Sequence, residues 1–596
     1  NTEYAAEHYQ EAVRYYKEAN DVINEADANR SLADIQRLNR HFSEAETAYR
    51  RALEIYQTTR DLFGSIDAQV GLAHIYLDQE RLNEAADLFA AALNSAQILE
   101  YELGQADANL GLAEVSFLQG SVDQALIGAQ AALQIYTDKR NALGSADATR
   151  ILAEINLRRG QLSYANSLME RALRTYQASA YRVGQAETTV GLGIIQYRRG
   201  FLERSLQNIN EGRKHAHALH NDVVEHRALL ALGDIYRQQG QSGQARSAYS
   251  DARTRIEQLG EPASAMGIAG AEIGLAKLAI LNGKLNEVEV HLATATDAMT
   301  KNPLALQLTP MVSVVQAQLL LTQGDFIQAE ERFSTAHNQA EAHQEPLLAA
   351  EAILGQAQTR LAKSELEAAS NTFLAAGRQF QLLESVDGDG EVVLGLAQLN
   401  IEQEKWDEAI ENCDAALTRF SQTHHLLGQA DALLTRGLVH RAKDELDEAL
   451  LDFEQALKLY HQQRRPLGVA DTRSARANIF LERGELERAR DEQAMAITQV
   501  EQVMESLSTP QQWSIFLRQY AELYAETAIT DIRRNQDEQA RTLLQKFVHI
   551  AGSTELERYL KEYEKDITAS GENLAEAELQ MDRDLLKRLG QVRKTL

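Results

Sequence analysis

The chain has 596 residues, of which 44% are hydrophobic and 25% charged, a balance typical of a folded chain with a core. Its formal net charge of −27 argues against a general nucleic-acid-binding protein, which needs a basic surface to engage phosphates. The single cysteine, Cys413, excludes a disulfide within the chain and favours a reducing compartment, so we expect a cytoplasmic protein.

A small residue recurs about every 40 positions and sets the register of the chain. The column starts at Ala5, slips by a few residues near the middle, resumes up to Ala489, and ends in a stretched unit at Ala540. Self-similarity at a fixed period of this length predicts a stacked array of repeats. The members between the first and the last regular unit are Ala45, Ala85, Ala125, Ala165, Ser205, Ala245, Val288, Ala329, Ala369, Ala409 and Ala449.

Each unit contains two helical patterns. Apolar side chains stand four, seven and eleven residues after the small column, and these offsets predict the buried face of a second helix. A leucine thirteen residues before the column marks a first helix, which a glycine ends, as at Gly120 and Gly160. The apolar face reads Tyr49, Ala52 and Tyr56 in one unit and Phe453, Ala456 and Tyr460 in another.

This order of leucine, small residue, glycine, alanine and aromatic resembles the helix-turn-helix motif of the tetratricopeptide repeat (TPR) family over roughly residues 1–545. The usual unit of that family has about 34 residues, so each unit here carries about six more. The proline that usually ends the unit is absent, and we therefore expect both helices to be long. The resemblance implies an all-α fold, an α-solenoid with a right-handed superhelix of about 13 stacked antiparallel helix pairs.

The pattern divides the chain into four segments. Residues 1–220 form a regular TPR block whose first repeat is truncated, so we expect that sequence has been removed before Asn1. Residues 221–310 form irregular TPR repeats and predict a change of superhelical pitch or a junction between blocks. Residues 311–503 form a second regular TPR block, and residues 504–596 form a divergent final helix pair with charged capping helices.

The start of the last segment carries a further resemblance. Residues 504–547 read as a Leu-Ser-Thr-Pro turn, Trp513, several aromatic residues and Glu-Gln-Ala540. This text is similar to the segment that joins the repeats to the caspase-like (CHAT) peptidase domain in bacterial TPR–CHAT proteins. Only about 50 residues follow, too few for a peptidase domain. The resemblance therefore implies an effector outside this chain.

A second column is acidic and stands eighteen residues before the small column. Arg227, Gly270 and Met311 divide it into an N-terminal ladder and a C-terminal ladder. The TPR resemblance implies that both ladders face the concave groove, where they could bind a basic or amide-rich segment. The alternative is that most of them lie in the first turn of a helix and stabilise its N-terminus by about 0.3–1 kcal/mol. The N-terminal ladder is Asp27, Asp67, Asp107, Asp147 and Glu187, and the C-terminal ladder is Glu351, Glu391, Asp431 and Asp471.

The same inference gives further groove candidates on the first helices. They mix acids, arginines and aromatic residues, as a peptide-binding surface would, and the alternative is an ordinary solvated face. These candidates are Glu114, Phe117, Glu154, Arg158, Ile194, Tyr197, Arg198, Asp234 and Arg237.

Residues that suggest chemistry are explained by the repeat. Cys413 falls in the buried aromatic column, where a thiol is unreactive. His217 and His220 can share a helix face, but two histidines without a third ligand make a poor metal site. Residues 387–391 resemble the start of a calcium loop, yet the later ligands are missing and they fall at the expected inter-repeat turn. Residues 304–321 are apolar but hold several amides, which favours a buried repeat helix over a membrane span.

We therefore predict a non-catalytic protein–protein interaction scaffold or sensor, with a peptide or protein partner in its concave groove. We predict no cofactor, no metal, no nucleic-acid partner and no membrane insertion. Two alternatives stay open. One is a regulatory repeat array of a larger protein whose effector, a CHAT-type peptidase or a signal-transduction ATPase, lies outside this chain. The other is a self-assembling structural array, since the oligomeric state is open.

Overall fold

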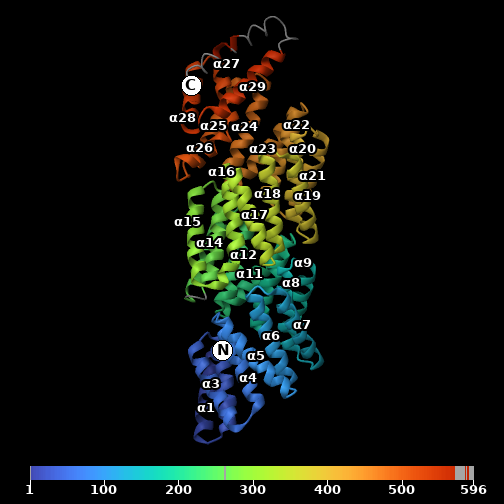
Figure 1. Ribbon diagram of the computed structural model, residues 1–596, viewed down its shortest axis with the longest axis vertical. Helices are drawn as coiled ribbons and strands as arrows, with labels where there is room; N and C mark the ends of the chain where they lie inside the picture. The colour runs from blue at the N-terminus through green and yellow to red at the C-terminus, as the bar shows by residue number, and fades with distance from the viewer. Residues whose placement is uncertain (1, 261–263, 571–583, 586, 590–596) are drawn as a thin grey trace.

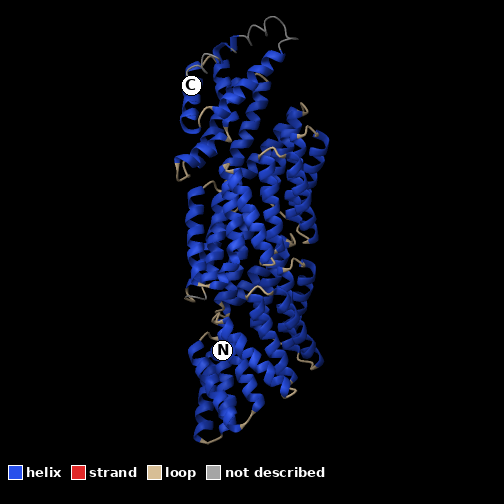
Figure 2. Cartoon of the chain, viewed as in Figure 1, coloured by secondary structure: helices blue, strands red, loops and turns tan. Residues whose placement is uncertain are grey.

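The computed structural model describes residues 2–260, 264–570, 584–585 and 587–589, and every regular element among them is a helix (Figure 2). Thirteen antiparallel pairs follow a single opening helix, α1 (Thr2–Glu18), as the repeat pattern predicts. Of the predicted charged capping region, α29 (Thr554–Ser570) is described, whereas residues 571–583, 586 and 590–596 lie outside the described residues.

The first helix of a pair begins at a side-chain cap in several repeats and ends at a left-handed residue. Asp61 and Asn141 each accept a hydrogen bond from the backbone N–H three residues later, which satisfies one free donor of the helix start. Gly120 and Gly160 follow the last turn with φ of 84° and 74°, as predicted for a helix end. The first helices are α2 (Val22–Leu38), α4 (Leu62–Asp78), α6 (Glu102–Leu118), α8 (Ala142–Arg158), α10 (Arg182–Arg198), α12 (Asp222–Gln238), α14 (Ala265–Leu281), α16 (Thr309–Gln323), α18 (Pro346–Ala362), α20 (Val386–Glu402), α22 (Leu426–Ala442), α24 (Pro466–Glu482) and α27 (Ala521–Arg533).

The second helix carries the core. Its alanine column is fully buried, and its aromatic residues pack against the first helix of the next repeat. The ring of Phe89 lies where a Cβ of Gly111 would stand, at 2.3 Å, so that position of the next first helix needs glycine. The second helices are α3 (Phe42–Thr59), α5 (Leu82–Ile98), α7 (Val122–Asp138), α9 (Leu162–Ala178), α11 (Leu202–Ala218), α13 (Ser242–Glu257), α15 (Leu285–Lys301), α17 (Phe326–Ala342), α19 (Leu366–Leu382), α21 (Trp406–Gln422), α23 (Leu446–Gln463), α25 (Leu486–Met504) and α28 (Asp537–Ala551).

Two short elements interrupt the regular alternation. A 3₁₀ helix, η1 (Pro303–Leu308), precedes α16, and a short helix, α26 (Pro510–Arg518), lies between α25 and α27. Together η1 and α16 have the length and hydropathy of a membrane span, with a mean hydropathy of 1.5. They are separate elements, however, and the 15 residues of α16 extend only about 22 Å. Val314 and Val315 of α16 are buried in the array, as predicted for a repeat helix.

The array coils until its successive superhelical turns touch. Hydrogen bonds join Ser163 to Glu384, Ser242 to the carbonyl of Gln463, and the backbone N–H of Leu285 to Ser506, each pair 221 residues apart. At 40 residues per repeat, one superhelical turn therefore takes about five and a half repeats. In Figure 1, α8 and α9 accordingly lie below α19–α21, and α14 and α15 lie below α26. We call this line of contacts between successive turns the seam.

Candidate functional site

The residues of the acidic column lie further along their helices than they would if their role were to stabilise the helix N-termini. Asp107 is the sixth residue of α6, and every member of both ladders holds the same sixth position in its own first helix. The expectation that most of them lie in the first turn is wrong, because the sixth residue of a helix lies in its second turn. A helix dipole acts mainly within its first turn, so stabilisation of N-termini does not account for the column.

The N-terminal ladder has a different structural partner. The hydroxyl of Tyr56 donates to Asp27 and that of Tyr176 donates to Asp147, each at 2.6 Å and each across 29 residues. The same bond joins Tyr136 to Asp107, and Tyr460 to Asp431 of the C-terminal ladder. These tyrosines are buried members of the second-helix stripe. The aspartates thus satisfy hydroxyl groups that would otherwise be buried without a partner.

The ladder residues are desolvated all the same. Burial raises the pKa of Asp107 to about 6, although the hydroxyl of Tyr136 opposes the shift, and Asp67 and Asp147 add to it by repulsion. Burial also raises the pKa of Asp67, against the attraction of Arg30 at 3.5 Å. The carboxylates of neighbouring repeats therefore lie close enough to act on one another, as expected on the concave side of a curved array.

Arg150 of α8 is the centre of a charge network in the N-terminal block. It is within 3.9 Å of Glu114, 3.4 Å of Glu154 and 3.5 Å of Glu187, which lie on three consecutive first helices. Arg227 of α12 completes the network at 3.2 Å from Glu154. Burial alone would raise the pKa of Glu154, but Arg227 and Arg150 together bring it below its ordinary value.

This network occupies the concave surface that the sequence assigns to a partner. The ion pair between Glu154 and Arg227 joins α8 to α12 across the intervening α10, so the first helices converge toward the superhelical axis. Glu114 is the least compensated member, because burial raises its pKa to about 7 against the attraction of Arg150. The chain therefore supplies its own cations to four of the seven acidic groove candidates of this block, Asp67, Glu114, Glu154 and Glu187.

Several other groove candidates serve the seam or the core. Arg158 donates to the carbonyl of His343 at 3.1 Å, pairs with Glu345 at 3.2 Å, and lies over the ring of Phe117. It thus fastens α8 to the next superhelical turn. Ile194 and Tyr197 are half-buried against the hydrophobic core between α10 and α12.

The remaining candidates lie at or near α12. Asp234 accepts a hydrogen bond from the buried Tyr249 at 2.7 Å and pairs with Arg237 at 3.5 Å. Arg198, the last residue of α10, is exposed. Its solvated position is the one that the groove inference requires.

The C-terminal ladder is compensated much less. No hydrogen bond or ion pair engages the carboxylates of Glu351 or Asp471 among the described residues. Burial raises the pKa of Glu391 to about 8, and repulsion from Asp431 and Asp387 adds to the shift. Burial likewise raises the pKa of Asp471 to about 7, with Arg465 opposing and Asp431 adding.

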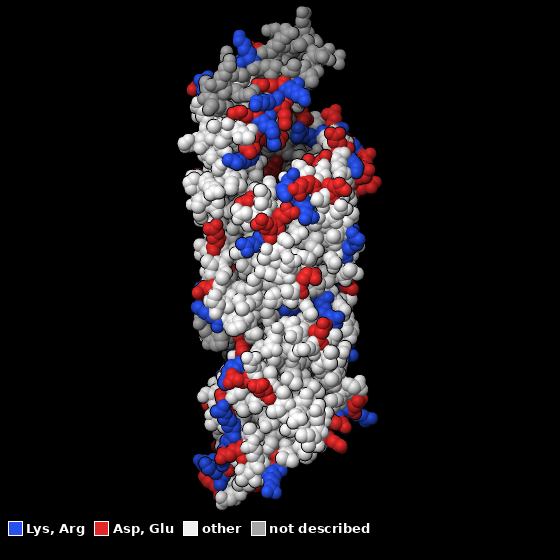
Figure 3. Space-filling view, in the orientation of Figure 1, with Lys and Arg blue, Asp and Glu red and all other residues white. Residues whose placement is uncertain are grey.

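One histidine faces this ladder. His425 Nδ1 lies 3.8 Å from Asp387 and 3.9 Å from Glu391, and its ring packs edge-on against Phe420. Burial lowers the pKa of His425 in spite of the acids around it. Figure 3 shows the surface hollowed between the C-terminal helices and the α20–α22 edge, with acidic side chains at the rim.

The described residues hold no cluster of histidine, cysteine and carboxylate side chains that fits a metal ion. Cys413 is buried, and burial raises the pKa of its thiol to about 12, as expected for an unreactive core residue. His217 pairs with Glu225 at 3.2 Å. The prediction that residues 387–391 form an inter-repeat turn is wrong, since Ser385 caps α20 and they lie within its first two turns.

Sequence reasoning missed the cations of the site. Arg150 stands in a column that holds Val70, Leu110 and Val190 in neighbouring repeats, and an arginine in an apolar column was the available signal. In the sequence, Arg227 stands out only because it interrupts the acidic column. In the structure it forms an ion pair with Glu154, a groove candidate on α8. No local pattern marks the approach of Arg465 to the C-terminal ladder.

Comparison with known proteins supports this architecture. Family models of the tetratricopeptide repeat match residues 70–139, 226–252 and 391–462. No curated protein matches the chain. The crystal structure of the APC/C hetero-tetramer Cut9-Hcn1 is similar with a TM-score of 0.50 and 13% identity, covering 95% of this chain and 96% of that chain, and shows the fold alone. A Rap protein complexed with competence and sporulation factor has a TM-score of 0.47 and 14% identity, covering 61% and 99%.

Proposed function

Because the chain is a tetratricopeptide repeat protein, we propose that it is a non-catalytic interaction scaffold that holds an extended partner segment against the C-terminal ladder. Arrays of stacked repeats use their concave face for this purpose. The observation that carries the proposal is the contrast between the ladders. The N-terminal ladder is bonded by tyrosines and arginines of the chain itself, whereas Glu391 and Asp471 are desolvated with little compensation.

The partner segment is basic. A carboxylate with a pKa raised to about 8 is costly to ionise, and a cation from a partner would lower that cost. A hydrogen bond between charged groups contributes about 1.5–3 kcal/mol. Glu391, Asp431 and Asp471 act on one another electrostatically, so successive basic side chains of one extended segment can engage them together.

Fluorescence anisotropy with a labelled peptide of alternating lysine and glycine tests the proposal, with a glutamine–glycine peptide as the neutral probe. The double variant Glu391→Gln/Asp471→Asn is expected to weaken binding of the lysine peptide at least tenfold. The control, Glu408→Gln/Glu411→Gln, replaces the same number of carboxylates on the exposed face of α21 and is expected to change binding less than twofold. Equal losses in both variants would mean that general charge attraction alone holds the peptide.

The N-terminal ladder is a poorer place for such a test. A binding role for Asp107 and Asp147 stays a prediction. The amide variants Asp107→Asn and Asp147→Asn would also weaken the acceptors of Tyr136 and Tyr176, so a fall in stability would accompany any effect on binding.

From the sequence of residues 504–547 we also infer that the repeats regulate an effector outside this chain, and from the single cysteine that the protein is cytoplasmic. The described part of this region contains α26, α27 and α28, which continue the array. Mass spectrometry of the native gene product tests the inference, and a product without further sequence at either end would contradict it.

A further inference from the structure

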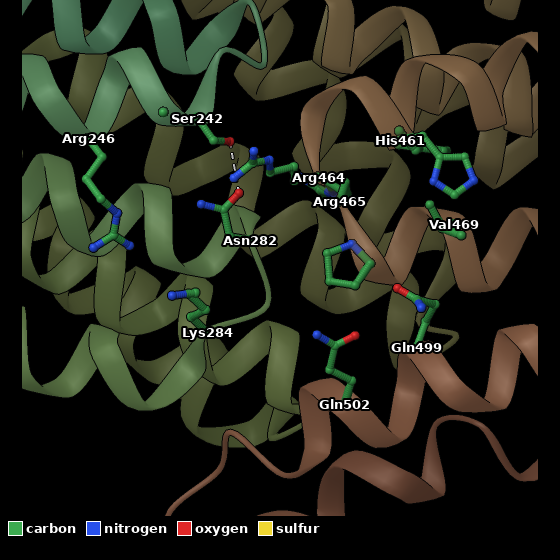
Figure 4. Close-up of a pocket in the computed structure, with 13 residues that line it drawn as sticks. Ser242, Arg246, Asn282, Lys284, His461, Arg464, Arg465, Val469, Gln499 and Gln502 are labelled. Atoms are coloured by element: carbon green, nitrogen blue, oxygen red, sulfur yellow. Dashed lines mark hydrogen bonds between the residues drawn. The ribbon is translucent and has the colours of Figure 1, made fainter.

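A cavity of about 440 Å³ lies at the seam, where α13–α15 of one superhelical turn meet α23–α25 of the next. Its size falls within the range of small-molecule sites. Figure 4 shows the side chains of the two turns facing the same space. Arg246, Asn282 and Lys284 come from one turn, and Arg464, Arg465 and Gln499 from the other.

All charged residues that line the cavity are basic, in a protein whose net charge is −27. Glu287, behind the wall, pairs with Arg246 at 2.8 Å and with Lys284 at 2.7 Å. Among the described residues, no carboxylate forms an ion pair with Arg464 or Arg465. The cavity therefore keeps a surplus of positive charge, which repels across the seam when nothing lies between its walls.

The N-terminus of α24 adds to the positive electrostatic potential of the cavity. Arg465 occupies the capping position and makes no side-chain cap hydrogen bond, as is also true at the start of α6, α10, α18 and α22, whereas Asp61, Asn141 and Ser385 cap α4, α8 and α20 with an oxygen acceptor. Pro466 follows as the first helical residue and lines the cavity. The positive end of α24 is thus left without an acceptor from its own cap.

We propose that this cavity binds a small polyanion, a molecule with two or more phosphate or carboxylate groups, which Arg246 and Lys284 contact from one turn and Arg464 and Arg465 from the next. Guanidinium groups bind such anions through paired hydrogen bonds. A small anion fits better than an acidic macromolecule, because the surface around the cavity belongs to a strongly acidic chain. The site adjoins the C-terminal ladder, since Arg465 also attracts Glu391 and Asp471, but the proposal does not rest on the function proposed for that ladder.

Isothermal titration calorimetry with inorganic pyrophosphate tests the site. The double variant Lys284→Ala/Arg464→Ala is expected to weaken binding at least tenfold. The control Arg213→Ala/Lys214→Ala removes the same charge from the exposed face of α11 and is expected to bind as the wild type does. The absence of heat at millimolar pyrophosphate, or equal weakening in both variants, would overturn the proposal.

Hydrogen exchange on the unaltered protein gives a second readout that needs no variant. Pyrophosphate is expected to slow exchange on both walls, at residues 282–285 and 461–469, because the anion ties the two turns together. Protection confined to one turn or to another region would overturn the assignment. Tighter binding of an acidic phosphopeptide than of pyrophosphate would overturn the small-molecule class.

Discussion

The glycines that end the first helices also make room for the next superhelical turn, and Gly200→Ala tests this role. A Cβ at Gly200 would lie 2.5 Å from Cγ2 of Thr423, which belongs to the following turn. Thr423 is buried and its hydroxyl donates to Asp387, so its side chain is not free to rotate away. We expect the added methyl group to strain or open the seam.

Gly484→Ala is a matched control. Gly484 has φ of 73° against 81° for Gly200, and both follow an arginine at the end of a first helix. No atom of the described residues lies within 4 Å of the place a Cβ would take at Gly484. In both variants an alanine in the left-handed conformation lowers the free energy of unfolding by about 1–2 kcal/mol. Only Gly200→Ala also introduces overpacking, which lowers it by about a further 1–3 kcal/mol.

Two measurements separate the outcomes. Guanidinium unfolding followed by circular dichroism is expected to show a lower midpoint for Gly200→Ala than for Gly484→Ala. Small-angle X-ray scattering is expected to show a larger maximum dimension for Gly200→Ala alone, if the strain is relieved by opening the seam. Identical midpoints and identical dimensions for the two variants would refute the role of the glycine in turn stacking.

Three further predictions concern the concave surface. Tyr176→Phe is expected to cost about 1–3 kcal/mol in the free energy of unfolding because Asp147 loses its donor, whereas Tyr164→Phe on the exposed side of α9 is expected to change nothing measurable. Arg150→Met removes the ion-pair partner of Glu114 and Glu187, while Glu154 keeps Arg227, and is expected to cost about 3–5 kcal/mol by chemical denaturation. The pKa of Glu391 is raised in the folded state from 4.5 to about 8, so folding binds a proton and stability is expected to fall as pH rises across that range. Glu391→Gln is expected to flatten this dependence in a pH series of unfolding midpoints, and an unchanged slope would contradict the reasoning.

The repeats, their helix boundaries and their core follow from the sequence because each depends on neighbours within one or two units. The hydrogen bonds between tyrosines and aspartates could also have been predicted from the sequence. The acidic column stands eighteen residues before the small column and the tyrosines eleven after it, so a constant spacing of 29 joins Tyr56 to Asp27 and Tyr460 to Asp431. From the sequence, the acidic column is assigned to the groove and the tyrosines to the core, which leaves the two columns unconnected.

The charge network and the seam depend on the rotation between neighbouring repeats, which the sequence of a single repeat does not specify. The small rotation between neighbouring repeats accumulates along the array and brings Glu154 to Arg227, and Gln238 to Asp387 at 2.6 Å. Residues 387–391 were misjudged for a local reason. Their glycines suggested a turn, but Gly388 is needed because the ring of Phe380 lies 2.2 Å from where its Cβ would stand.

The seam changes how the array is expected to lose its structure. A solenoid whose repeats contact only their neighbours behaves as a one-dimensional chain and can open piece by piece. Here most repeats also contact a repeat one superhelical turn away. The array is therefore held together both between sequential repeats and between successive turns. Opening one middle repeat then disturbs two turns at once, which makes the transition more cooperative. Fraying should begin at the two ends, where a repeat has a neighbouring turn on one side only.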